Sequence, residues 1–292
     1  MPTRSTGSSW PASRADGSVG VPERPAEVAE ALRRLGVRPA RELGQSFLTD
    51  RFVADALAAL AEPGSDGPFF EIGGGLGIVT RALVDRGVRE LTVVERDRRL
   101  ADHLAATFGD AVTVRCEDAR GVPFPPGSTV VGSLPFASGT EIVFGLFRRR
   151  IRRLAVILQK EVAERFAAEP PGRAYGRPSI VARLYGSGEL FREVPPEAFY
   201  PRPQVASRLY VHTARVGPLP VPSVDRLEAV VRVLFRSRRK QLGNLLPQLA
   251  DDADAAGRLA REAEWPAGWD RRRPEELPPE AFFRLATVLD RR

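Results

Sequence analysis

The sequence predicts an α/β protein, in which a doubly wound parallel sheet of Rossmann-like type precedes a small helical domain. Strand patterns alternate with helix patterns between residues 67 and 160, which is typical of a parallel sheet. A glycine-rich turn follows the first of these strands, and from residue 223 onward the apolar spacing is helical. At 292 residues the chain is long enough for one large and one small domain. We expect a disordered tail at 1–24, a catalytic domain at 25–217 and a helical RNA-binding domain at 218–292.

The individual elements follow from apolar periodicity and end signals. Asp50 is a good cap for the helix that follows it, and Ser138 with Glu141 matches the S-x-x-E capping box. Residues 67–87 predict, in turn, a strand, a glycine turn and a helix. The other expected strands lie within 90–97, 111–119, 128–136 and 153–160; the other expected helices are 26–37, 50–62, 98–109, 139–149, 223–250, 254–265 and 278–290.

Composition excludes several kinds of chemistry. The one cysteine, Cys116, excludes an internal disulfide and a multi-cysteine zinc site, and we expect it to be a buried thiol at a strand end. The two histidines, His103 and His212, are far apart, which argues against Ser-His or Cys-His catalysis and against a metal site. No run of about 18 uncharged apolar residues is present, and the first 25 residues lack the apolar core of a secretory signal. We therefore expect a cytoplasmic monomer without a membrane span; an organelle transit peptide is the alternative for the tail.

Glycines and acidic residues follow three successive predicted strands. In "EIGGGLGIVT", Gly73 and Gly75 come directly after an apolar strand, where glycine lets backbone N–H groups approach a ligand closely. Glu95 ends the next strand, at roughly the 20-residue offset where an acid binds a ribose diol. Asp118 ends the third and could accept from an adenine amine. The dinucleotide pattern G-x-G-x-x-G would end at Ile78, which argues against NAD. The set predicts a site for S-adenosylmethionine (SAM); turn glycines and surface acids are the alternative.

The stretch "VVGSLPF" brings Ser133, Leu134, Pro135 and Phe136 to the same edge of the sheet. Pro135 fixes φ and disfavours helix at Leu134, so backbone carbonyls there can point into a cleft. A flat base could stack on Phe136 while the Leu134 carbonyl and the Ser133 side chain accept its amino hydrogens. Such acceptors stabilise the positive charge that develops on the amine during methyl transfer. The alternative is a plain strand-ending turn with a core phenylalanine.

From residue 40 to about 250 the sequence resembles the ribosomal RNA adenine N6-dimethyltransferase family. The matching segments keep the family's order: "LGQSFLTD", "EIGGGLGIVT", "VVERD", "EDA", "SLPF", "QKEVAERFAAEPPGRAYGRPSIVARLY", "EVPPEAFYPRPQVASRLYV" and "FRSRRKQLGNLL". The longest segments are closer to the small-subunit branch than to the drug-resistance branch. The resemblance implies a SAM-dependent Rossmann-like domain, a small helical domain, and dimethylation of adenine in 16S rRNA during small-subunit maturation.

The resemblance also implies roles for individual residues. Ser133 corresponds to an asparagine that contacts both cofactor and target amine, and Phe136 to the stacking ring. The implied cofactor contacts are Ser46 and Leu48 at the methionine end of SAM, Gly73 in the cofactor turn, Glu95 on the ribose and Asp118 on the adenine.

Two positions depart from the family, since Ser46 and Ser133 stand where it usually has asparagine. Serine is shorter and lacks the second hydrogen-bonding arm of an amide, which affects the expected rate and the choice between one methyl group and two. These two serines motivate one rival function, a non-catalytic ribosome-assembly or transcription factor on the same fold. A second rival keeps the same chemistry and is methylation of 23S rRNA with macrolide-type antibiotic resistance.

A net charge of +7, carried almost wholly by arginine, indicates a polyanionic partner. With the resemblance, that partner is ribosomal RNA or an immature ribosomal subunit. Two dense basic runs lie beside family segments, at 148–153 and 232–240. A solvated charged face is the usual alternative for such runs. The predicted RNA contacts are Arg148, Arg149, Arg236, Arg239 and Lys240.

Overall fold

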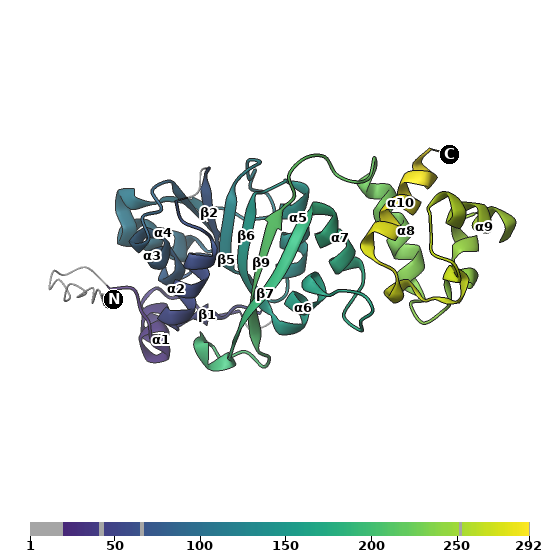
Figure 1. The fold of residues 1–292 in the computed structure, drawn as a ribbon. Helices are drawn as coiled ribbons and strands as arrows, with labels where there is room; N and C mark the ends of the chain where they lie inside the picture. Colours follow the sequence, from purple (N-terminus) through teal and green to yellow (C-terminus); the bar gives the residue numbers. More distant parts are fainter. Residues whose placement is uncertain (1–19, 41–43, 65–66, 251–252, 292) are drawn as a thin grey trace, which may run out of the picture.

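The computed structural model describes residues 20–40, 44–64, 67–250 and 253–291 (Figure 1). Most of the predicted tail, residues 1–19, lies outside the described residues. The strands are β1 Phe47–Leu48, β2 Phe69–Ile72, β3 Leu91–Glu95, β4 Thr113–Cys116, β5 Thr129–Ser133, β6 Arg153–Gln159, β7 Gly186–Val194, β8 Phe199–Tyr200 and β9 Ser207–Ala214. The α-helices are α1 Pro25–Arg34, α2 Arg51–Leu60, α3 Ile78–Asp85, α4 Arg98–Phe108, α5 Gly139–Arg148, α6 Lys160–Ala167, α7 Arg177–Tyr185, α8 Val224–Arg236, α9 Ala253–Glu262 and α10 Pro279–Asp290.

The main sheet has the order β4-β3-β2-β5-β6-β9-β7, and its first five strands are parallel. The chain runs outward from β2 through β3 to β4, then returns to place β5 on the other side of β2. Ile72 pairs with Gly132 across these two strands. A Cβ at Gly132 would lie 2.4 Å from the Ile72 carbonyl oxygen, so only glycine fits there. Because the strand order reverses between β2 and β5, the carboxyl ends of these two strands form the topological switch point, where ligands bind in open α/β sheets.

Helices cover both faces of the sheet. Successive side chains of a strand point to opposite faces, so neighbouring residues of one strand pack against different helical layers. In β5, Val131 packs with α2, α3 and α4, whereas Val130 packs with α5 and α7. In β6, Ala155 and Ile157 pack in the same cluster as Val131, and Leu154 packs in the same cluster as Val130. All of these side chains are fully buried. The doubly wound α/β class predicted from the sequence is confirmed.

The expectation of a wholly parallel sheet was wrong at one edge. β9 pairs antiparallel with both β6 and β7, and both β7 and β9 lie beyond residue 160, where the last predicted strand ends. Because β9 lies between two strands, it is buried on both faces and lacks a clear alternation. At the opposite edge, β4 is largely open to solvent, so Cys116 is exposed instead of buried.

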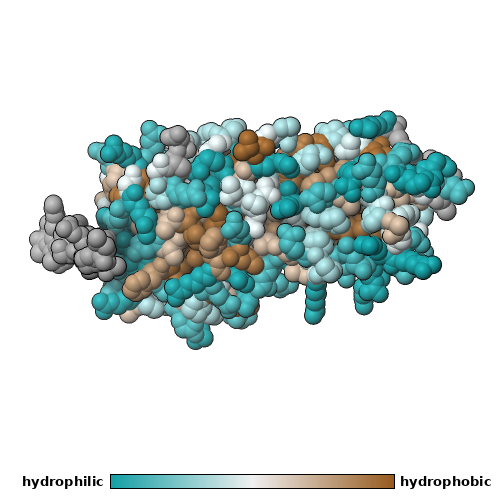
Figure 2. All heavy atoms as spheres, viewed as in Figure 1, coloured by the Kyte–Doolittle hydropathy of each residue, from teal (hydrophilic) through white to brown (hydrophobic). Residues whose placement is uncertain are grey.

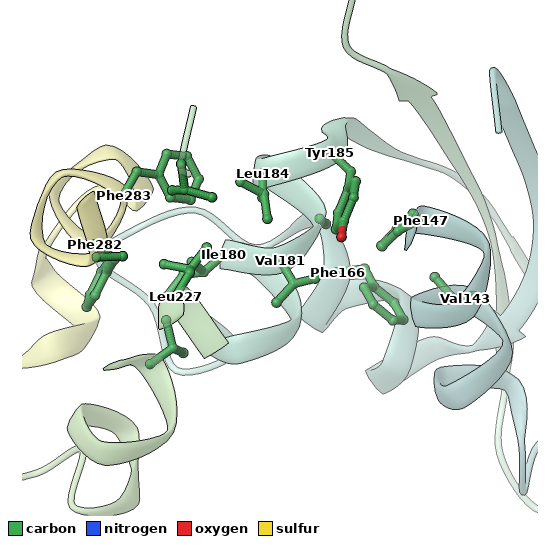
Figure 3. Packing of buried hydrophobic residues seen from close by; sticks show 14 of the residues in the cluster. Val143, Phe147, Phe166, Ile180, Val181, Leu184, Tyr185, Leu227, Phe282 and Phe283 are labelled. Carbon is green, nitrogen blue, oxygen red and sulfur yellow. The ribbon is translucent and has the colours of Figure 1, made fainter. Parts of the chain in front are cut away.

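The C-terminal helices lie beyond α7, at the end of the molecule remote from α1 (Figure 1). The single helix expected over 223–250 was wrong, because α8 ends at Arg236 and two short 3-10 turns follow. Figure 3 shows Ile180 and Leu184 of α7 close to Leu227 of α8 and Phe283 of α10, within one continuous hydrophobic cluster. The boundary predicted near residue 217 stays a prediction; it lies between β9 and α8, outside both elements.

Candidate active site

The turn after β2 is built from glycines that no other residue could replace without strain. Gly73 and Gly75 have φ of +75° and +56°, in the left-handed region. A Cβ on Gly74 would lie 2.4 Å from a methyl carbon of Val93 on β3. The turn therefore packs its backbone directly on the neighbouring strand, and it ends at the first turn of α3.

Glu95, at the end of β3, is held against this turn. Its Oε2 accepts a hydrogen bond from the Gly75 backbone N–H at 3.0 Å, and its Oε1 accepts one from the Asp97 N–H at 3.0 Å. The side chain is buried, which raises the pKa of Glu95 against the lowering effect of these hydrogen bonds. A carboxylate has about four lone-pair positions, so it can accept further hydrogen bonds from a ligand.

Glu71 was not among the candidate residues derived from sequence, although it also faces this site. It is 1% exposed and accepts a hydrogen bond at 2.6 Å from the Thr80 hydroxyl on α3. Burial, and secondarily the neighbouring charge of Glu95, raises the pKa of Glu71 to about 7. The signal in the sequence was an acid in an apolar strand directly before the glycine turn, but nothing in the local pattern marks this acid as buried.

Two adjoining cavities follow the carboxyl ends of β2, β3 and β5. They share Gln45, Gly73, Glu95 and Pro135, and we call them together the acidic cleft. The larger cavity, of about 640 Å³, falls in the range typical of small-molecule sites. The acidic cleft contains all seven residues predicted to bind cofactor: Ser46, Leu48, Gly73, Gly75, Glu95, Asp118 and Ser133.

Asp118 lies at the outer end of the acidic cleft. The guanidinium of Arg120 donates to its carboxylate at 2.7 Å and lowers the pKa of Asp118 to about 2. Arg96 is a second cation, at 4.0 Å. Asp118 is therefore ionised at neutral pH and acts only as a hydrogen-bond acceptor, the role expected toward an adenine amine.

The turn at Ser133–Phe136 continues directly from β5. The Leu134 N–H donates to the Ile157 carbonyl at 3.2 Å, which extends the pairing with β6 by one residue. The predicted capping box is absent, since the Ser138 side chain makes no cap hydrogen bond. Instead the Pro135 carbonyl accepts from the N–H groups of Ser138 and Gly139, at 3.2 and 2.8 Å. No described residue donates a hydrogen bond to the Leu134 carbonyl, so this acceptor is not used within the described protein.

A second cleft opens on the other side of this turn. It is lined by Gly44, Gln45, Ser46, Phe136, Ala137, Gln159, Pro201, Arg202, Pro203, Gln204 and Val205, and we call it the amide cleft. Its volume is about 600 Å³, and no carboxylate is among its described lining residues. The half-buried ring of Phe136 lines it and contacts Phe199 edge to face, with ring centroids 6.4 Å apart. Two segments far apart in sequence meet here because β1 pairs with β8.

Gly44 shows how closely the two walls of the amide cleft approach. Its φ is +66°, and a Cβ there would lie 2.9 Å from the Cβ of Phe136. Gln45 is fixed next to it, because its Oε1 accepts from the Ala40 N–H at 3.0 Å. Gln45 and Ser46 line both clefts. The catalytic candidates divide accordingly: Ser133 and Pro135 line the acidic cleft, Phe136 lines the amide cleft, and the side chain of Leu134 is buried in the hydrophobic core.

The two basic runs differ in what their arginines contact. Arg148 pairs with Glu228 of α8 at 2.5 Å, and Arg149 donates to the carbonyls of Gly145 and Arg120 at 3.1 and 2.9 Å. These two cations are engaged within the protein. Arg236, Arg239 and Lys240 are exposed, on the C-terminal part of the molecule, where hydrophilic residues cover most of the visible face (Figure 2). Their roles as RNA contacts stay predictions.

Comparison with known sequences agrees with this geometry. The family described as ribosomal RNA adenine dimethylase matches residues 38–259. The chain belongs to this family. As a ribosomal RNA adenine dimethylase, it carries the glycine turn, the SLPF turn and the amide cleft all inside the matched region.

Named relatives cover nearly the whole adenine dimethylase chain. A probable ribosomal RNA small subunit methyltransferase A from Natronomonas pharaonis is 38% identical over 88% of this chain and 95% of the relative. A ribosomal RNA small subunit methyltransferase A from Verminephrobacter eiseniae is 36% identical over 92% and 95%. Among solved structures, the 23S rRNA methyltransferase ErmE has a TM-score of 0.66 at 25% identity and covers 84% of this chain and 99% of its own. A dimethyladenosine transferase from Plasmodium falciparum has the same TM-score at 19% identity, over 82% and 95%, and supports the fold alone.

Within the described ranges, no helix combines the length and apolarity that a membrane span requires. The monomeric state and the cytoplasmic location expected from the sequence stay predictions.

Proposed function

We propose that this enzyme transfers methyl groups from SAM to N6 of adenine in 16S rRNA, to the dimethyl product, during maturation of the small subunit. One observation carries the proposal: an acid-lined cleft and a carboxylate-free cleft meet at the Ser133–Phe136 turn. A methyl donor on one side and a flat nucleobase on the other would share that turn. The proposal assigns residues 25–217 to catalysis and 218–292 to RNA binding.

The residues of the acidic cleft fit SAM by their chemistry. Glu95 has spare acceptor capacity for the two hydroxyls of a ribose, and the glycine turn leaves space that side chains would fill. Ser46 and Leu48 would lie at the methionine end, and Asp118 at the adenine. When bound, SAM supplies a methyl group on a positively charged sulfonium, which suits a cleft lined by the Glu95 carboxylate.

On the other side, the chain would bind and orient the target base. Phe136 offers a ring face for stacking, which is worth about 1–3 kcal/mol per base. The Leu134 carbonyl and the Ser133 side chain would accept the amino hydrogens, and they would hold the nitrogen lone pair toward the methyl donor. No histidine is required, because the proton leaves an amine that has become cationic. The proton can pass to solvent after transfer.

Identity to the relatives favours the small subunit as the substrate. The two methyltransferases named for the small subunit are 38% and 36% identical to this chain, whereas ErmE, named for 23S rRNA, is 25% identical. The 23S function is therefore the second candidate, supported by the ErmE fold, which matches 84% of this chain and 99% of its own.

The test is to incubate the full chain with methyl-labelled SAM and either immature small subunits or protein-free 23S rRNA. Nucleosides from the labelled RNA are then identified by mass spectrometry, and the modified positions are mapped by primer extension. Labelled N6,N6-dimethyladenosine in 16S rRNA is the expected result. Label in 23S rRNA alone would support the second candidate, and RNA binding without transfer would support a non-catalytic assembly factor.

A further inference from the structure

We propose that Gln159 selects and orients the target base, by donating a hydrogen bond from its side-chain amide to a ring nitrogen beside the exocyclic amine. In adenine these acceptors are N1 and N7, which flank N6. The inference rests on the proposed function, because it assumes that an adenine enters the amide cleft. It adds a specificity-determining residue that lies outside the SLPF turn.

The topology places Gln159 next to the catalytic turn. It is the last residue of β6, and β6 pairs in parallel with β5, with Ser133 opposite Ile157. Side chains two residues apart on a strand point to the same face, so Gln159 shares the face of Ile157 and Ser133. It lies roughly 7 Å farther along the strand direction, at the outer end of the sheet. A base held at Ser133 would therefore present its edge toward Gln159.

The Gln159 amide is not committed to the protein fold. The residue occupies the N-cap position of α6, where polar side chains commonly accept from the helix, yet it makes no side-chain cap hydrogen bond. No hydrogen bond from its amide to any other described residue is found, although the side chain lines the amide cleft. Gln45 differs, because its Oε1 accepts from the Ala40 N–H. Gln204 also lines the cleft but is exposed on the loop before β9.

The backbone around Gln159 is rigid, which a specificity residue requires. Gln159 pairs with Ser207 on β9, and the Lys160 N–H donates to the Ala206 carbonyl at 3.0 Å. Lys160 itself turns to Glu193, with its Nζ 2.8 Å from that carboxylate. The strand end is thus fixed on both sides while the amide remains available.

The chemistry of an amide suits this task. Glutamine pairs naturally with adenine edges, since it supplies an N–H donor and a carbonyl acceptor at once. A glutamate of the same shape can only accept when ionised, so it would face the lone pair of N1 or N7 with no proton to share. The one charged residue in the described lining of this cleft, Arg202, is paired with the Glu197 carboxylate, and Phe136 supplies the stacking face.

The experiment compares target atoms as well as protein variants. Small subunits are reconstituted with 16S rRNA that carries adenosine, 7-deazaadenosine or 1-deazaadenosine at the target position, which the primer extension under Proposed function identifies. Single-turnover methyl transfer is measured for the unaltered protein, Gln159→Ala, Gln159→Glu and the control Glu90→Gln, which alters an exposed residue that lines neither cleft. The unaltered protein and the control should lose roughly tenfold in rate on one of the two deaza substrates. The Gln159 variants should be slower by a similar factor on adenosine and insensitive to that deaza change.

Two results would overturn the inference while leaving the proposed function intact. One is an unaltered protein equally fast on all three substrates. The other is a Gln159→Ala variant that still loses rate on the same deaza substrate, which would indicate a structural role. Absence of transfer by the unaltered protein to any adenosine substrate would instead overturn the proposed function.

Discussion

The acidic cleft and the amide cleft lie on two sides of one short turn, yet they are built by opposite means. Backbone groups and buried carboxylates form the acidic cleft, with Glu71 and Glu95 both less than a tenth exposed. The amide cleft has an aromatic ring, prolines and glutamines, and its described lining includes no acid. A cationic, hydroxyl-rich ligand suits the first, whereas a neutral base on a polyanionic strand suits the second, which acids would repel.

The contrast predicts that variants on the two sides separate cofactor binding from transfer. The largest effect is expected for Glu95→Ala, because a buried carboxylate that accepts from ligand hydroxyls is removed together with its contacts to Gly75 and Asp97. SAM affinity measured by calorimetry should fall about 100-fold or more. Normal SAM affinity in this variant would show that the acidic cleft is assigned wrongly. Circular dichroism of the same sample checks that the fold is retained.

A pH-dependent effect is expected from Glu71. Its pKa is about 7 in the folded protein and 4.5 as an unperturbed group. Between these values the unfolded chain loses the proton while the folded chain keeps it, so the free energy of unfolding falls as pH rises. Relative to Glu71→Gln, the unaltered protein should lose on the order of 3 kcal/mol between about pH 4.5 and pH 7. Urea unfolding of both proteins from pH 4.5 to 8 measures this difference.

The exposed Glu90→Gln variant is the matched control for that series, since it removes the same kind of group from the surface. The pH series of this variant is the baseline with which the Glu71→Gln series is compared. A Glu71→Gln series that matches this baseline would mean that Glu71 is not held protonated by burial.

On the amide side, Phe136→Ala should leave SAM affinity unchanged and slow single-turnover transfer by roughly 10- to 100-fold, the range expected for one lost stacking contact. Phe136→Tyr keeps the ring and should retain most of the rate. The ring is half-buried against Phe199, so a melting curve accompanies each variant. Equal loss of SAM binding and transfer in Phe136→Ala would remove the distinction between the two clefts.

The sequence predicted the acidic side better than the amide side, for a physical reason. Gly73, Gly75 and Glu95 follow strands at short, regular spacing, so the parallel fold alone brings them to one edge. The amide cleft depends on β1 pairing with β8, which joins residues near Ser46 to those near Pro201. No local pattern encodes that pairing, and only the resemblance gave an expectation for Ser46. Gln159 was missed for the same reason.

The sequence also did not predict which charged side chains are paired within the protein. The pattern of residues 148–153 did not distinguish arginines that form ion pairs and hydrogen bonds within the protein from arginines that are exposed to solvent. Glu228 decides the matter, because it is nearly buried on α8 and accepts from both Arg148 and Arg177. An acid 80 residues farther along the chain cannot be anticipated from the spacing of the run itself.

The smallest expected effects test whether the same distinction holds for RNA binding. Arg239→Ala and Lys240→Ala remove exposed cations, so each should weaken binding to small-subunit RNA a few-fold and lower the salt slope of the binding constant by about one. Arg148→Ala removes a partner of Glu228, so it should lower the melting temperature and leave the salt slope as it was. Filter binding between low and moderate salt, with melting curves on the same samples, measures both quantities. If Arg148→Ala lowered the salt slope as much as Arg239→Ala, the cation of Arg148 would reach RNA despite its pairing with Glu228. Pairing with a buried acid would then not distinguish structural arginines from RNA-binding ones.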